Sequence, residues 1–351
     1  MLTFRKENQA FGTRLIAPCL AAMALLFSSG IKAQETTIKL AHVNPADWTV
    51  SQKGAAGDVF KYMVESESGG QLKVELYPAG QLGAELELVG QVQSGAIQMT
   101  MVSGVFGRFC KEVSILDIPY LFSSAPVAYA VLESDFGKKL ADHCLAQTGM
   151  RILAYGEVGF RNFTNNVREI KTPEDIKGLK LRVQEVPLYL TLVKALGGVP
   201  TPIAWSETPG ALRTGVVDGQ ENPVAIILSM KFFEFQKYIT LDQHVYGTDF
   251  ILINENFFGG LSGEQQANVL RNAKIAGRTS QSIQQVNSAA GIAALQKHGM
   301  KVYKPTGEQL AQFREQAQPP VVEFLKKEVD PKWIDDLMAA VANAEKSLQI
   351  D

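Results

Sequence analysis

The chain has 351 residues, of which 46% are hydrophobic and 20% are charged. This is the ordinary composition of a globular protein, and the length is sufficient for two domains. The formal net charge of −2 argues against a nucleic-acid partner, because surfaces that bind nucleic acid are normally strongly basic.

The N-terminus has the pattern of a secretory signal peptide. Arg5, Lys6 and Arg14 are basic, residues 15–27 are apolar, and Ala33 is a small residue before a plausible cleavage point. A membrane anchor is the alternative, but the apolar run is shorter than the roughly 18 residues that a spanning helix needs. We therefore predict cleavage after Ala33 and a mildly acidic mature protein outside the cytoplasm.

Two cysteines, Cys110 and Cys144, remain in the mature chain. An oxidising compartment allows them to form a disulfide, but their spacing does not show whether they meet, and we expect two free, buried thiols. A zinc site is not expected, because no histidine cluster accompanies them. The chain has no metalloprotease, phosphate-loop or nucleophile-elbow motif, so no local pattern predicts an enzyme.

The first part of the mature chain alternates between strands and helices. Residues 37–41 and 72–77 are predicted strands, with a loop over 42–48 and a helix over 51–66 between them. This β-loop-α-β opening is typical of an α/β ligand-binding domain. Further predicted elements are a helix over 85–93, a strand over 96–101, a helix over 136–146 and a strand over 151–155.

Residues 172–223 carry the most information. Thr172 is a suitable N-cap for a short helix that Gly178 can end, and the alternation over 179–183 predicts a strand. Arg182 lies on the polar face of this strand, where its planar fork can grip a carboxylate; the alternative is a solvated surface arginine. An apolar helix from 187, an irregular segment ending at 205, a helix capped by Ser206, and a strand and turn over 215–219 follow.

Glycines mark the expected crossovers between domains. Gly156 and Gly159 permit one crossover, and the chain is expected to cross back near Gly247. The other predicted elements are an amphipathic helix over 231–237, a strand over 250–254, a long helix over 262–296 interrupted at Gly277 and Gly291, a strand over 300–303, and two C-terminal helices.

Three motifs, at residues 177–183, 200–207 and 215–223, occur in the order found in one known family. Together they closely resemble the solute-binding subunit of tripartite ATP-independent periplasmic (TRAP) transporters, the DctP family. The resemblance implies an α/β fold of the periplasmic-binding-protein type II class, in which a hinge joins two α/β domains and a long helix spans both. It implies a signal peptide at 1–33, domain I at 34–158 plus 248–287, domain II at 159–247 plus 288–351, and a ligand cleft between the domains.

The same resemblance implies a carboxylate-binding site. Arg182 would form the main salt bridge, Arg161 would be a second cation, and Asn222 would add amide hydrogen bonds. Trp205 would pack on the carbon skeleton of the ligand. Two alternatives remain open: Trp205 as a core indole, and Arg161 as a structural arginine paired with Glu157 or Asp175.

Weaker site candidates are polar residues at positions that face the cleft in the family: Glu85, Ser103 and Asp249. The chain departs from the family at Pro209, where many members carry an aromatic residue, so a contact from that ring is not carried over. Some keto-acid binders have Glu-Trp where this chain has Glu221 and Asn222, and they hold a cation with the ligand. We therefore predict no metal and no cofactor.

The function that the resemblance implies is capture rather than catalysis. The protein would be a monomeric periplasmic subunit that binds an organic-acid carboxylate and delivers it to the small and large membrane subunits of the transporter. The alternatives are a sensory binding protein for the same ligands and a secreted enzyme acting on organic acids. The candidate residues suit a monocarboxylate, hydroxy acid, sugar acid or aromatic acid, or a dicarboxylate if Arg161 takes the second carboxylate.

Overall fold

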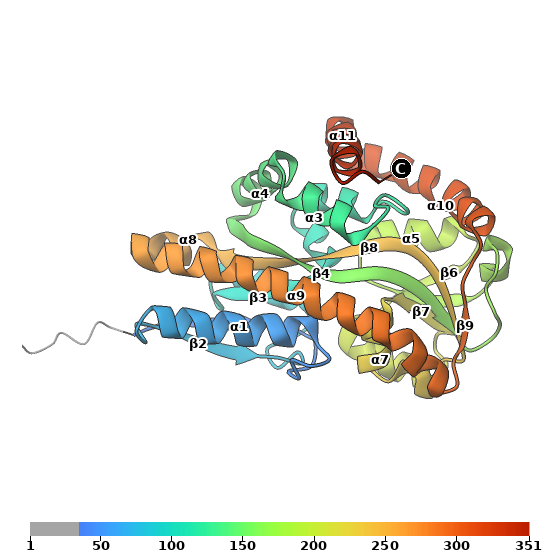
Figure 1. The fold of residues 1–351 in the computed structure, drawn as a ribbon, viewed down its shortest axis with the longest axis horizontal. Coiled ribbons are helices and arrows are strands. Elements are labelled where there is room, and N and C mark those ends of the chain that lie inside the picture. Colours follow the sequence, from blue (N-terminus) through green and yellow to red (C-terminus); the bar gives the residue numbers. More distant parts are fainter. Residues whose placement is uncertain (1–34, 351) are drawn as a thin grey trace, which may run out of the picture. The chain divides into compact units, whose positions relative to one another are not determined.

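The computed structural model describes residues 35–350 (Figure 1). The predicted signal peptide lies outside these residues. The strands are β1 Thr36–Ala41, β2 Leu72–Tyr77, β3 Met99–Val102, β4 Met150–Asn165, β5 Lys180–Val183, β6 Val199–Pro202, β7 Gly219–Asn222, β8 Tyr238–Asn254 and β9 Lys301–Tyr303. The helices are α1 Gln52–Glu67, α2 Glu85–Ser94, α3 Ala125–Glu133, α4 Asp135–Thr148, α5 Pro187–Ala195, α6 Thr208–Thr214, α7 Val224–Ser229, α8 Glu255–Gly260, α9 Gly263–Lys297, α10 Gly307–Glu328 and α11 Pro331–Ser347, with short 3-10 turns between some of them.

The strands form one sheet in the order β2-β1-β3-β8-β4-β7-β5-β6, with β9 beside β8. In the first half, β1 runs parallel to β2 and β3, and β3 is antiparallel to the C-terminal end of β8. In the second half, β7, β5 and β6 are parallel, and β7 is antiparallel to the C-terminal end of β4. Only β4 and β8 run through both halves, so these two strands connect them (Figure 1).

The two connecting strands are far longer than the sequence predicted. β4 and β8 pair from Met150 opposite Asn254 to Asn165 opposite Tyr238, with register shifts between. The glycines expected to mark crossovers lie inside the strands instead. Gly159 has φ +100° at one of the register shifts, which is a backbone conformation that suits glycine at a bulge. The bulges bend the strands, so the chain crosses without leaving the sheet.

Several local predictions in the second half are wrong. The segment with Pro200 and Pro202 is the edge strand β6, where proline is tolerated because no strand pairs on the outer side. Ser206 lies within a 3-10 turn, and α6 starts only at Thr208. The strand expected over 215–219 begins at Gly219.

The predicted helix over 231–237 is also absent. α7 ends at Ser229, and Lys231 has φ +53°, a left-handed conformation that interrupts the helix. A short 3-10 turn over Phe232–Glu234 follows before β8 begins. The phenylalanines of this segment do not form one buried helical face. Phe232 is fully buried, whereas Phe233 and Phe235 are only partly buried.

Helix α9 crosses both halves of the sheet without interruption. It has 35 residues, a length of about 50 Å, and packs on α1, β4 and α7 (Figure 1). The predicted breaks at Gly277 and Gly291 are wrong. These glycines let α9 approach its neighbours, since a Cβ on Gly277 would lie 2.6 Å from the Tyr155 carbonyl oxygen and one on Gly291 would lie 2.7 Å from the Val224 side chain.

We expect Gly277→Ala to lower the free energy of unfolding by about 1–3 kcal/mol, because the new methyl group must push α9 away from the backbone of β4. The matched control is Gly263→Ala in the same helix, where a Cβ meets nothing within 4 Å. Urea unfolding of both variants checks this. Equal stability of the two variants would contradict the close-approach argument.

The expectation of two free thiols is wrong. Cys110 and Cys144 form a disulfide, with their Cα atoms 5.5 Å apart. Cys110 precedes a 3-10 turn over Lys111–Asp117, and Cys144 lies on the buried face of α4. The two residues are 34 positions apart, and only the packing of that turn against α4 brings them together.

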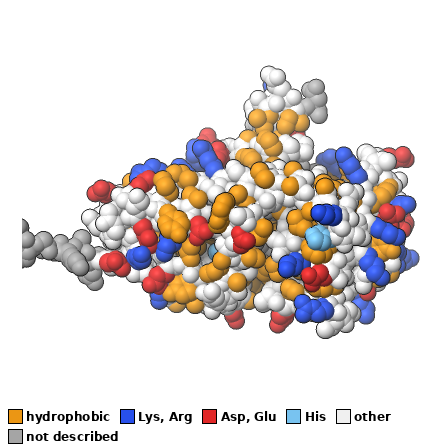
Figure 2. All heavy atoms as spheres, turned by 60° about the horizontal axis from the view of Figure 1, so that its bottom comes forward, with side chains coloured by type: hydrophobic (Ala, Val, Ile, Leu, Met, Phe, Trp, Pro, Cys, Tyr) orange, Lys and Arg blue, Asp and Glu red, His pale blue; other side chains and the backbone are white. Residues whose placement is uncertain are grey.

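The surface has no dominant charge on the face shown in Figure 2, where acidic and basic side chains are interspersed with apolar ones. Within residues 35–350, no helix combines the length and apolar character needed to cross a membrane.

Candidate functional site

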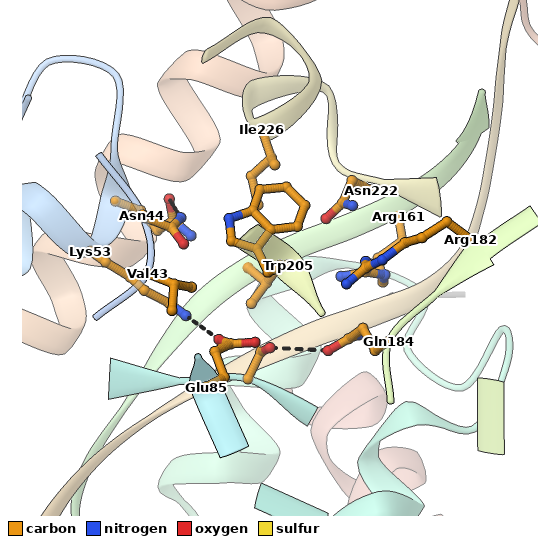
Figure 3. A pocket seen from close by; sticks show the side chains of 13 residues that line it. Val43, Asn44, Lys53, Glu85, Arg161, Arg182, Gln184, Trp205, Asn222 and Ile226 are labelled. Atoms are coloured by element: carbon orange, nitrogen blue, oxygen red, sulfur yellow. Dashed lines mark hydrogen bonds and ion pairs between the residues drawn. The ribbon is translucent and has the colours of Figure 1, made fainter. Parts of the chain in front are cut away.

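A small cavity lies where the two halves of the sheet meet (Figure 3). The space open to the centre of a water molecule is about 30 Å³. The lining residues are Val43, Asn44, Gln52, Lys53, Glu85, Ser103, Val158, Arg161, Arg182, Gln184, Trp205, Asn222 and Ile226.

The topology explains why these residues converge. Asn44 follows β1, Ser103 follows β3, Gln184 follows β5 and Asn222 ends β7, so each lies at the C-terminal end of a parallel strand. Ligands of open α/β sheets bind at this edge. Six of the seven predicted site residues line the cavity, and Asp249 does not.

Arg182 is the cation that the structure leaves without an acidic partner. It is 3% exposed, its Nε donates to the carbonyl oxygen of Ile203 at 2.9 Å, and no carboxylate of residues 35–350 lies within ion-pair distance. Burial lowers its pKa to about 10, with Glu221 opposing and Arg161 adding to the shift, so it stays protonated at neutral pH. The alternative of a solvated arginine is wrong, and the site offers an unmatched positive charge to an anion.

Arg161 is paired, but not with the residues considered from the sequence. Its guanidinium donates hydrogen bonds to both carboxylate oxygens of Glu221, with Nη2 2.8 Å from Oε1. The same Nη2 also donates to the backbone carbonyl oxygen of Glu221 at 2.7 Å. His244 Nε2 lies 3.2 Å from the same carboxylate, and its Nδ1 lies 2.8 Å from Asp242. Arg161 therefore reaches the cavity with its charge already balanced.

The charges in this network hold each other ionised. Burial opposes the charge on Glu221, but Arg161 and His244 outweigh it and lower the pKa of Glu221 to about 2. Burial likewise opposes the charge on His244, but Asp242 and Glu221 raise its pKa to about 9. Sequence reasoning missed His244 as part of the site because it was one of several isolated histidines.

Trp205 and Asn222 lie on the same side of the cavity as the arginines (Figure 3). The half-buried indole packs against Phe232, with 5.9 Å between the rings, while the guanidinium of Arg182 lies 5.6 Å from the indole centre. Trp205 is thus both part of an apolar cluster and part of the cavity wall. The Asn222 amide is held by the side chain of Gln220.

The opposite side holds a charged cluster that the sequence reasoning only partly predicted. Lys53, in the first turn of α1, lies 3.1 Å from Glu85 Oε1 and 3.1 Å from Asp249 Oδ1. The contact with Glu85 is a hydrogen bond, whereas the contact with Asp249 is an ion pair only. Asp249 contacts Lys53 and does not line the cavity, and its predicted contact with the ligand stays a prediction. Lys53 was missed because nothing in a helical pattern marks a lysine as buried.

Ser103 Oγ donates to Gln184 Oε1 at 3.1 Å and so joins the two sides of the cavity. Gln184 was not predicted, although it lies two residues after Arg182 and alternation already placed it on the same face. Within residues 35–350, no group of three His, Cys, Asp or Glu side chains has a metal-binding arrangement.

A buried carboxyl group lies where β4 bends. Glu157 accepts hydrogen bonds from the Tyr129 hydroxyl and from Gln285 Nε2, the latter at 2.6 Å. Burial raises the pKa of Glu157 to about 7, although both hydrogen bonds oppose the shift. α3, β4 and α9 therefore meet at one carboxyl group that changes its charge near neutral pH.

Protonation of Glu157 stabilises the fold, because its folded pKa of about 7 lies above its ordinary value of 4.5. This contribution is fully present below pH 4.5 and is lost as the pH rises through about 7, at a cost of about 3 kcal/mol. Glu157→Gln, which cannot ionise, should flatten the pH dependence of stability over this range. Urea unfolding at several pH values checks this, and an unchanged slope would contradict it.

Residues 40–328 match the family described as bacterial extracellular solute-binding protein, family 7, the DctP family. The chain belongs to this family. Its fold is the two-domain periplasmic-binding architecture, as three solved structures show.

A TRAP periplasmic solute-binding protein from Bordetella bronchispeptica, described with pantoate, is 36% identical, with a TM-score of 0.81 over 87% of this chain and 99% of that one. The sugar-acid-binding protein of Advenella mimigardefordensis, in complex with galactonate, is 32% identical, with a TM-score of 0.84 over 89% and 99%. A TRAP protein from Polaromonas bound to D-erythronate is 32% identical, with a TM-score of 0.82 over 87% and 99%. The predicted family and fold are confirmed.

Proposed function

We propose that this protein is the solute-binding subunit of a TRAP transporter and that it captures a small hydroxylated carboxylate. The observation that carries the proposal is Arg182, a buried cation that lines the cavity and has no acidic partner within residues 35–350. Burying a charge is expensive unless a partner compensates it, so such a site is built for an anion.

The ligand class follows from the residues around Arg182. Arg182 binds the carboxylate, and Arg161 and Asn222 contribute hydrogen bonds beside it. Trp205 packs on the carbon chain. The pantoate, galactonate and D-erythronate of the structural relatives all carry a hydroxyl group next to the carboxylate and fit this arrangement. The small cavity favours the shorter of such acids.

Binding and release require the two domains to separate. We propose domain I at 34–158 plus 248–287 and domain II at 159–247 plus 288–351, with the hinge in β4 and β8. The bulges of these strands support this placement, because they interrupt the pairing where the chain passes between the halves. The contact between Ser103 and Gln184 would form on closure.

The protein acts in the periplasm after cleavage of residues 1–33, as a monomer, and delivers its ligand unchanged to the small and large membrane subunits. Family membership supports export and transport. The absence of turnover is part of the proposal and is tested together with binding.

The test uses the mature protein, residues 34–351, unfolded and refolded to remove any retained ligand. Thermal shift against organic acids, sugar acids and amino acids should show stabilisation by hydroxylated carboxylates, about 2.7 kcal/mol at a hundredfold excess over Kd. Mass spectrometry of the recovered ligand should find it unchanged. Absence of a shift with every acid, together with no ligand in the protein as first purified, would overturn the proposal, and a converted ligand would indicate an enzyme.

A further inference from the structure

The two sides of the cavity differ in their charge. On one side, Glu221 is paired with Arg161, and Arg182 has only a carbonyl oxygen as partner within residues 35–350. The positive charge of Arg182 is therefore unmatched. The opposite side has one cation, Lys53, and two carboxylates, Glu85 and Asp249. The cavity therefore offers an unmatched cation to one end of a ligand and an excess of carboxylates to the other.

Lys53 has no unmatched charge left for a ligand carboxylate, because two carboxylates already surround it. Its ammonium is 3.1 Å from each of the two carboxylates and is almost completely buried. Its pKa is raised: burial lowers it, but Asp249 and Glu85 outweigh burial. Glu85, 11% exposed, lines the cavity, and its second oxygen Oε2 has no hydrogen-bond partner within residues 35–350. Lys53 thus holds in place a carboxylate that can accept one more hydrogen bond.

An acceptor fixed in this way suits a hydroxyl donor and repels an anion. A ligand hydroxyl can donate to Glu85, whereas a second ligand carboxylate would meet Glu85 as a like charge. The neighbouring side chains, Asn44 and Gln52, are neutral amides and bring no compensating charge.

Resting on the proposed function, we infer that the cluster of Lys53, Glu85 and Asp249 selects monocarboxylates with a hydroxyl group at the far end and rejects dicarboxylates of the same length. Glu85 is the residue that touches the ligand. Lys53 and Asp249 are positioning residues, since they fix Glu85 and neutralise each other.

Two matched ligand pairs test this by isothermal titration calorimetry. D-Erythronate and meso-tartrate differ only in that the terminal CH₂OH of the first is a carboxylate in the second, and D-galactonate and galactarate differ in the same way. We expect the hydroxyl-ended member of at least one pair to bind about a hundredfold or more tightly than its diacid.

Variants locate the selectivity. In Asp249→Asn, Lys53 loses one partner and becomes available to a second carboxylate, so the preference should fall to about tenfold or less. Glu85→Gln should give the same change and also weaken binding of the monoacid. The control Glu133→Gln removes an exposed acid that only contacts Arg278 at 3.8 Å, and it should keep the full preference. Circular dichroism and melting curves show whether each variant folds. One folded variant of the cluster, Asp249→Asn or Glu85→Gln, is sufficient for the test.

The possible results distinguish failure of the inferred selectivity from failure of the proposed carboxylate-binding function. Equal or tighter binding of the diacids, or an unchanged preference in a folded variant, overturns the selectivity but leaves the carboxylate-binding function. Binding of neither pair, when other carboxylates of the wider panel bind, has the same meaning. If no carboxylate binds at all, the proposed function fails and the inference fails with it.

Discussion

Replacement of Arg182 by Met is expected to abolish ligand binding and to leave the unliganded protein at least as stable as the wild type. The loss follows from removal of the unmatched buried cation. A ligand carboxylate left without its partner costs about 3–5 kcal/mol, which is a loss in affinity of about 150- to 5,000-fold. The retained stability follows from burial, which lowers the pKa of Arg182 to about 10 and costs the unliganded fold about 3 kcal/mol. Calorimetric titration and melting curves measure the two effects.

Arg213→Met is the matched control, since this arginine is exposed in the last turn of α6 and does not line the cavity. It should leave affinity unchanged. Arg182→Lys keeps the charge but loses the two parallel hydrogen bonds of the guanidinium, so its affinity should be intermediate. Wild-type affinity in Arg182→Met would remove the carboxylate assignment, and strong destabilisation of the unliganded variant would show that Arg182 is structural.

Replacement of Glu221 by Gln is expected to have the largest effect on stability. It removes the carboxylate partner of Arg161 in a fully buried network and leaves His244 with Asp242 alone, which should lower the free energy of unfolding by about 3–5 kcal/mol. The stabilisation from Glu221 is present above pH 4.5 and is lost as the pH falls through about 2, so the deficit should shrink in acid. Urea unfolding at pH 7 and at low pH measures both.

Removal of the whole pair gives the decisive comparison. Arg161→Met combined with Glu221→Leu removes both charges, so it should recover much of the stability that Glu221→Gln loses. Glu207→Gln, at an exposed acid, is the control. A loss below about 1 kcal/mol in Glu221→Gln would mean that the pair contributes little.

Local patterns were sufficient for the parts of the molecule that depend on near neighbours in sequence. The alternation over 72–77 predicted β2 residue for residue, and Gly178 has the left-handed conformation (φ +76°) expected at the end of its short helix. The same alternation placed Arg182 on a strand face away from Leu181. These features rest on periodicity and backbone preference, which act over a few residues.

Three motifs also identified the family, because each combines a strand end with a turn whose chemistry is local. The motifs contain Arg182, Trp205 and Asn222, and the wider resemblance added Arg161, Glu85 and Ser103; all six line one cavity, although their roles stay predictions. The resemblance did not show that Arg161 is already paired, because that depends on Glu221, 60 residues away.

By itself, then, the sequence determined the family, the class of fold and six of the residues that line the cavity. Tertiary structure alone decided the disulfide between Cys110 and Cys144, the full length of β4 and β8, and the partners of Lys53. The physical reason is the same in each case. A disulfide, a continuous antiparallel ladder and a buried ion pair are contacts between distant segments, and their energies depend on the packing and low dielectric of the finished fold.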